Sequence, residues 1–151
     1  TTLFRSLGFQ LVYSLLNAME GVVCERFVYP EANHPLRSLE SSRPLRDFPL
    51  VFGSISFEHD YPRLTALLAA GGIQPFAADR GSAVEAGNPL VVLGGVGVFM
   101  NPEPLALFAD LMVIGEAEPI LDPLVEALSG YLGIPRNDLL RRVGSTVTRR
   151  R

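Results

Sequence analysis

The sequence has no lysine and no tryptophan, and its 151 residues include one cysteine and two histidines. All 13 basic side chains are therefore arginines, which excludes a lysine Schiff base and the lysine of a phosphate-binding loop. Cys24 cannot form an internal disulfide, and one thiolate is too few to hold zinc or an iron–sulfur cluster. These absences exclude several common kinds of active site.

Long apolar runs are also absent. No stretch of about 18 apolar residues could cross a membrane, and the first residues lack the basic and then apolar pattern of a secretory signal. The net charge of −3 disfavours a general nucleic-acid binder, which usually carries a basic face. We therefore expect a cytoplasmic protein with neither a membrane nor a nucleic acid as partner.

The sequence is rich in apolar residues, which make up 48% of it, so the chain can bury one core. Apolar spacing and helix-start signals predict helices at 7–19, 60–70, 102–109, 116–131 and 136–143. Short apolar runs predict strands at 22–29, 50–57, 89–93 and 111–114, and a strand-like connection at 73–78. Continuously apolar strands that alternate with helices predict an α/β fold, a Rossmann-like or flavodoxin-like doubly wound parallel sheet.

One element is missing from this order. A doubly wound domain normally begins with its central strand, whereas this chain begins with a helix. In the flavodoxin-like strand order 2-1-3-4-5 the missing element is the innermost strand, and residues 1–4 are too short to replace it. We therefore expect a strand upstream of residue 1.

The candidate site lies where the predicted strands end, because open parallel sheets bind ligands beyond the carboxyl ends of their strands. Glycines there let a backbone approach a ligand, and serine hydroxyls can hydrogen-bond to it. For Glu116, stabilisation of a helix N-terminus is a sufficient alternative to a role in ligand binding. Asp60 is interpreted as a helix cap and His59 as part of a solvated turn. The candidate cofactor-binding residues are Ser54, Ser56, Gly94, Gly95, Gly97 and Glu116.

Several segments of the chain together resemble one family. They are SLGFQLVYSLLN (6–17), VCERFVYP (23–30), FGSISFEHDYP (52–62), GGIQPFAADR (71–80) and residues 88–128, which include NPEPLA and VIGEAE. This combination resembles the N-terminal, cobalamin-binding-like domain of a family of radical SAM proteins.

The resemblance implies a particular domain organisation. Residues 1–130 would form the cobalamin-binding-like domain, and 131–151 a helix and arginine-rich tail that lead to a radical SAM barrel in the same polypeptide. In that barrel a CxxxCxxC motif would hold a [4Fe-4S] cluster and cleave S-adenosylmethionine. The chain has no such motif, so it would be an accessory domain without catalysis of its own.

The resemblance also makes cobalamin a candidate cofactor. Related cobalamin-binding domains often carry DxHxxG after the first strand, but with Gly8 as the motif glycine, Leu3 and Arg5 occupy the acidic and histidine positions. His34 follows the next predicted strand, in a different loop. Cobalamin would therefore bind without a histidine ligand, with its tail between segments 54–56 and 94–97.

Two other functions stay open. The domain could bind no cofactor and support the barrel, with a filled pocket and an exposed apolar surface through which the isolated fragment would self-associate. Alternatively, it could be a flavodoxin-like carrier or a receiver domain. The absence of lysine disfavours the receiver, and segment 5–8 is a poor substitute for a flavin phosphate loop.

Overall fold

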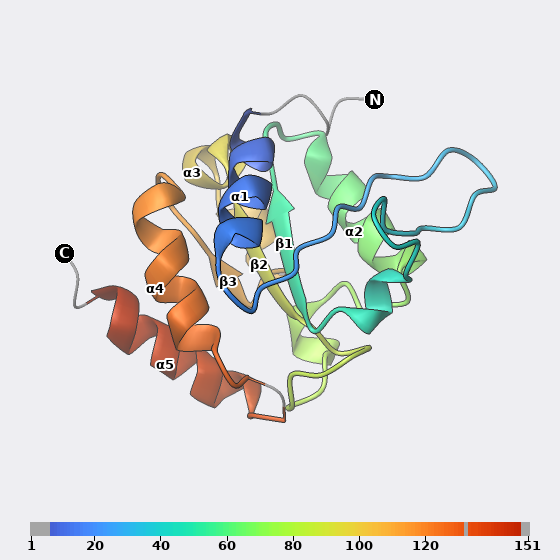
Figure 1. The fold of residues 1–151 in the computed structure, drawn as a ribbon. Helices are drawn as coiled ribbons and strands as arrows, with labels where there is room; N and C mark the ends of the chain where they lie inside the picture. The colour runs from blue at the N-terminus through green and yellow to red at the C-terminus, as the bar shows by residue number, and fades with distance from the viewer. Residues whose placement is uncertain (1–6, 132, 149–151) are drawn as a thin grey trace.

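The computed structural model describes residues 7–131 and 133–148. Its sheet contains β1 (Leu50–Ser54), β2 (Leu90–Gly94) and β3 (Leu111–Met112), all parallel and in the order β1-β2-β3. Figure 1 shows α2 (Asp60–Ala70) on one side of this sheet, and α4 (Glu118–Leu128) and α5 (Arg136–Thr148) on the other. The predicted α/β fold with a doubly covered parallel sheet is confirmed.

Strand periodicity divides the core into two layers. In the central strand β2, Val91 and Leu93 pack with Leu64 and Leu68 of α2, whereas Leu90 and Val92 pack on the opposite face. That second face is covered by Leu124 and Leu128 of α4 and by Leu139 and Val143 of α5. Because successive side chains of a strand point to opposite faces, a continuously apolar strand is buried on both sides.

Two glycine turns end helices where the sequence predicted. Helix α1 (Leu7–Ala18) is followed by Gly21, whose φ is 76°, and α2 is followed by Gly72, whose φ is 74°. Glycine adopts this left-handed conformation without the steric cost of a side chain. In Figure 1, α1, α2 and α4 all begin at the end of the sheet to which β1 points, so their first residues surround the carboxyl ends of the strands.

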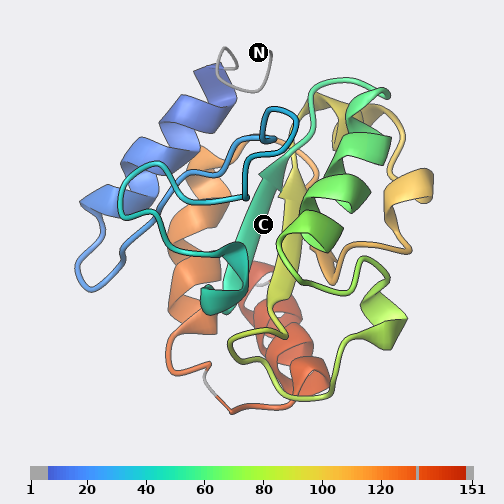
Figure 2. The same cartoon turned by 90° about the vertical axis from the view of Figure 1, so that its right-hand side faces the viewer.

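The predicted strand at 22–29 is wrong. Within the described residues this segment makes one isolated antiparallel bridge, between Phe27 and Ser38, and Figures 1 and 2 show segment 22–45 as a long loop that leaves α1 and crosses β1 towards the side of α2. A strand needs a neighbour that satisfies its backbone groups, and no strand pairs with the outer edge of β1 in the described part of the chain. The strand expected upstream of residue 1 lies outside the described residues.

The predicted helix at 102–109 is also wrong. Helix α3 (Val96–Met100) begins earlier, and the later segment forms a short 3₁₀ turn at Glu103–Leu105. Prolines at 102 and 104 remove two backbone donors, and each proline also disfavours the α conformation of the residue before it. The connection at 73–78 forms no strand; further 3₁₀ turns lie at Leu45–Asp47 and Ala77–Asp79.

Candidate functional site

The carboxyl ends of β1 and β2 bring most of the candidate residues together. Ser54 and Gly94 are register partners, and the Ile55 N–H donates to the Gly94 carbonyl oxygen at 2.8 Å. The Gly97 N–H returns a hydrogen bond to the Ile55 carbonyl oxygen at 2.9 Å. The two loops that follow these strands are therefore joined by their backbones.

The glycines of the second loop accommodate Ile55. A Cβ atom on Gly95 would lie 2.5 Å from the Ile55 carbonyl oxygen, and one on Gly97 would lie 2.7 Å from Ile55 Cγ2. Gly95 also has a φ of 104°, which a residue with a side chain rarely adopts. Ile55 is buried, with 3% of its surface exposed, so it fills the space between the two loops.

The polar groups of the first loop are bonded within the loop. The Asp60 carboxylate accepts hydrogen bonds from the N–H groups of Ser56 at 3.1 Å and Phe57 at 3.0 Å. Asp60 was predicted to cap α2, but it is the first residue of that helix and its buried side chain closes the preceding turn instead. The Ser56 and Phe57 N–H groups therefore already have an acceptor.

Tyr61 was not predicted to belong to the site. Its hydroxyl lies 3.3 Å from the Gly97 carbonyl oxygen and 3.1 Å from that of Asn101, so it ties α2 to both ends of α3. No sequence signal marks this contact, because the two carbonyl groups lie 36 and 40 residues away along the chain.

Five large apolar side chains are exposed in the segments that follow the three strands, two of them in loops and three in α3, and we call them the carboxyl-edge surface. Their exposed fractions range from 55% to 73%. Acidic side chains follow them closely in the sequence, and the candidate residue Glu116 is an exposed member of this acidic set, with Glu58 and Glu118. His59 stacks on one of the apolar rings at 5.4 Å between centroids. The five residues are Phe57, Val96, Phe99, Met100 and Ile114.

Comparison with known families adds to this geometry. The sequence profile described as "Radical SAM proteins, N-terminal" matches residues 8–148. The chain belongs to this radical SAM N-terminal family. No curated protein and no solved structure matches it. The matched region contains all of α2 to α5, the whole sheet and the carboxyl-edge surface.

This radical SAM N-terminal domain offers few groups for a metal. Within residues 7–131 and 133–148, no cluster of three or more His, Cys, Asp or Glu side chains could hold an ion. Cys24 is a free thiol, and its burial, followed by the charges of Glu40 and Glu25, raises its pKa. No helix in the described part of the chain is long and apolar enough to cross a membrane.

The fit of a cobalamin tail can be tested on the loops themselves. A tail between segments 54–56 and 94–97 would need the space that Ile55 fills and would break its two backbone hydrogen bonds. The residues present therefore do not fit a group inserted between these loops.

Proposed function

We propose that the domain is an accessory module that packs against the radical SAM barrel of its own polypeptide through the carboxyl-edge surface. The observation that carries this proposal is the exposure of five large apolar side chains in segments that follow all three strands. Exposed apolar surface is typical of interaction sites. Association would remove this surface from water.

The charges near the surface suggest the chemistry of the partner. Glu58, Glu116 and Glu118 are exposed beside the apolar residues in sequence, so the partner face should be apolar at its centre and basic at its rim. Within the described residues, the backbone N–H groups of Ile55, Ser56 and Phe57 are already bonded within and between these loops. A supporting role therefore agrees better with this geometry than a buried cofactor site.

Cobalamin is the second candidate, and the same surface favours it. A corrin ring could lie over the exposed apolar side chains without entering between the loops. S-adenosylmethionine and the [4Fe-4S] cluster are proposed for the barrel. A cytoplasmic location is proposed as well, because Cys24 has no cysteine in this chain with which to form a disulfide.

Methionine oxidation tests the proposed docking. Met100 is 73% exposed, so dilute peroxide should oxidise it readily in the isolated domain and several-fold more slowly in the full-length protein. Met19 is only partly exposed, lies beyond α1 and serves as the internal reference. Peptide mass spectrometry measures both rates. Equal Met100 oxidation in the two proteins contradicts the proposal.

A pair of matched substitutions makes the test specific. Phe99→Asp places a charge on the carboxyl-edge surface, whereas Leu107→Asp changes a side chain of similar exposure, 64% against 62%, outside it. In the full-length protein Phe99→Asp should restore Met100 oxidation, and Leu107→Asp should not. A titration of the same protein with hydroxocobalamin tests the second candidate, and an absence of spectral change at micromolar concentrations excludes it.

A further inference from the structure

A buried cluster of three charged side chains lies at the opposite, amino-terminal edge of the sheet. One oxygen of Asp110, Oδ2, lies 2.9 Å from Arg136 Nη1 and 3.1 Å from Arg80 Nη2. The exposed fractions of the Asp110, Arg136 and Arg80 side chains are 2%, 9% and 1%. Two guanidiniums therefore share one carboxylate, which leaves a formal charge of +1 inside the protein.

Backbone carbonyls accept most of the guanidinium hydrogens. Arg136 donates to the carbonyl oxygens of Gly81, Asn88 and Pro89. Arg80 donates through its two Nη atoms to three further carbonyl oxygens, those of Gln74, Pro75 and Phe108. These dipoles lower the cost of burying the charge but do not neutralise it.

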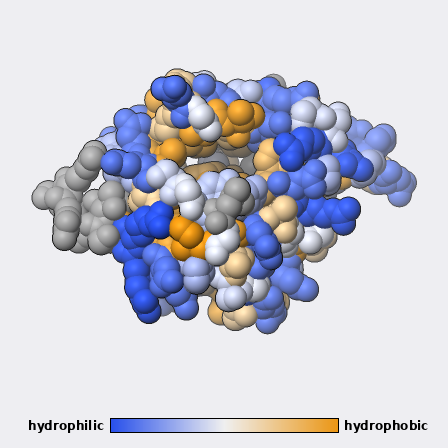
Figure 3. Space-filling model, turned by 60° about the horizontal axis from the view of Figure 1, so that its bottom comes forward, coloured by the Kyte–Doolittle hydropathy of each residue, from blue (hydrophilic) through white to orange (hydrophobic). Residues whose placement is uncertain are grey.

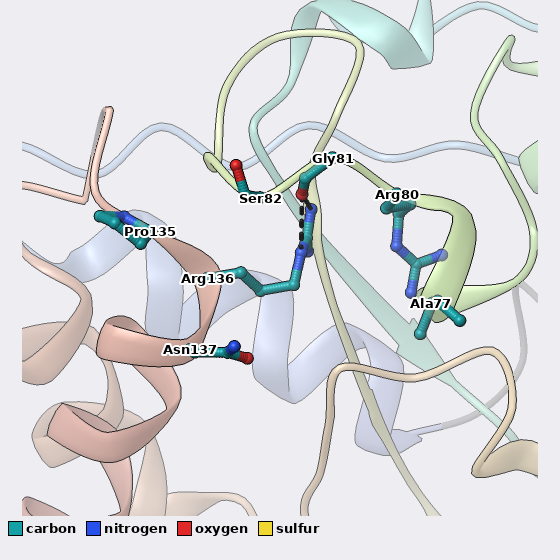
Figure 4. Close-up of a pocket in the computed structure, with 8 residues that line it drawn as sticks. Ala77, Arg80, Gly81, Ser82, Pro135, Arg136 and Asn137 are labelled. Atoms are coloured by element: carbon teal, nitrogen blue, oxygen red, sulfur yellow. Dashed lines mark hydrogen bonds between the residues drawn. The ribbon is translucent and has the colours of Figure 1, made fainter.

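One donor of the cluster has no acceptor. Among the described residues, Arg80 Nε is buried and makes no hydrogen bond. An unpaired buried donor destabilises the fold, and more so when the group is charged. In Figure 4 this atom lies on the side of Arg80 that faces Arg136, across the space between the two side chains. Burial lowers the pKa of Arg80, partly offset by Asp110 and reinforced by Arg136.

A pocket of about 260 Å³ lies beside this cluster. Figure 3, which views the amino-terminal edge, shows that this face is hollowed near its centre. Arg80 and Arg136 line the pocket together with Ser82 and Asn137, and its lining contains no carboxylate side chain. Asn137 lies in the first turn of α5, where the helix dipole also favours negative charge.

We propose that this pocket binds a tetrahedral oxyanion, either free phosphate or the phosphoryl group of a small metabolite. The anion neutralises the excess charge of the Arg80–Asp110–Arg136 cluster, whose two arginines both line the pocket. The hydroxyl of Ser82 and the amide of Asn137 are the polar groups available to orient it. The volume is slightly below the range of about 300–1,000 Å³ common for ligand pockets, which suits a small anion better than a nucleotide.

The Nε–H signal of Arg80 in an NMR spectrum of the full-length protein tests the proposal directly. Inorganic phosphate, added at constant ionic strength against sodium chloride, should shift this signal along a saturable curve with half-saturation at or below about 1 mM. Glycerol 3-phosphate is the second probe, and tighter binding than phosphate assigns the remaining volume to the organic part. The absence of a saturable shift with both probes overturns the proposal.

Two variants locate the binding. Asn137→Asp places a carboxylate in the lining, so it should move the Arg80 signal without added anion and weaken phosphate binding at least about tenfold. Arg141→Gln removes one positive charge from the same helix at a side chain that is 80% exposed, and phosphate should bind this control as it binds the unmodified protein. Unchanged phosphate binding in Asn137→Asp, or an equal loss in Arg141→Gln, refutes the assignment to this pocket.

Discussion

Asp110→Asn perturbs the buried charge cluster most selectively. The substitution keeps an oxygen that can accept the Val91 N–H, which lies 2.7 Å from Oδ2, but it removes the only negative charge shared by Arg80 and Arg136. Breaking a buried ion pair by removing one partner costs about 3–5 kcal/mol, because the remaining charge stays buried without compensation. We expect a loss of this size, which is a large part of the ~5–15 kcal/mol that stabilises a domain.

Urea denaturation followed by circular dichroism measures this loss. Asp138→Asn is the matched control, because it removes the same charge from an aspartate–arginine pair whose side chains are 55% and 80% exposed. Exposed pairs contribute about 0–1 kcal/mol, so the control should change the free energy of unfolding little. If Asp110→Asn costs no more than the control, the buried cluster does not stabilise the fold as argued.

Two further outcomes follow from the fold. Gly95→Ala should destabilise the domain more than Gly115→Ala: both residues have positive φ, 104° and 122°, but only the first new Cβ would meet Ile55, at 2.5 Å. Both variants carry the strain of a positive φ, which costs about 1–2 kcal/mol. Equal denaturation midpoints for the two variants would therefore contradict the additional close contact of Gly95→Ala with Ile55. The raised pKa of Cys24 predicts slower alkylation by iodoacetamide at pH 8 in the folded protein than in urea, and equal rates would contradict it. A folded pKa above the unfolded value also means that this thiol's contribution to stability is fully present below about pH 8.5 and falls as the pH rises further.

The sequence predicted the layers of the fold better than its local pairings. Alternation along β2 and the glycine turns after α1 and α2 are local signals, and the structure has both. The strand at 22–29 fails because a strand depends on a neighbour, which propensity does not report. The helix at 102–109 fails because a favourable helix start is followed by a second proline at 104, which disfavours the α conformation in the residue before it.

In the candidate site, too, the sequence indicates local features better than contacts between distant residues. The sequence correctly located Ser54 and Gly94 at adjacent strand ends, because parallel strands end at one edge. It interpreted Gly95 and Gly97 as room for a ligand, whereas they make room for Ile55. Several partners of Arg80 and Arg136 lie 28 to 55 residues away, and sequence spacing alone gives no sign of such distant contacts.

Arg136 also has a mechanical consequence. As the first residue of α5, it is bonded to Asn88 and Pro89, which directly precede β2, while Leu139 and Val143 hold the same helix against α4. A tilt of α5 would therefore strain the start of β2 and the packing of α4 together. Strand β2 ends at Gly94, shortly before α3, so Arg136 connects the start of α5 through this strand to the edge that carries part of the carboxyl-edge surface.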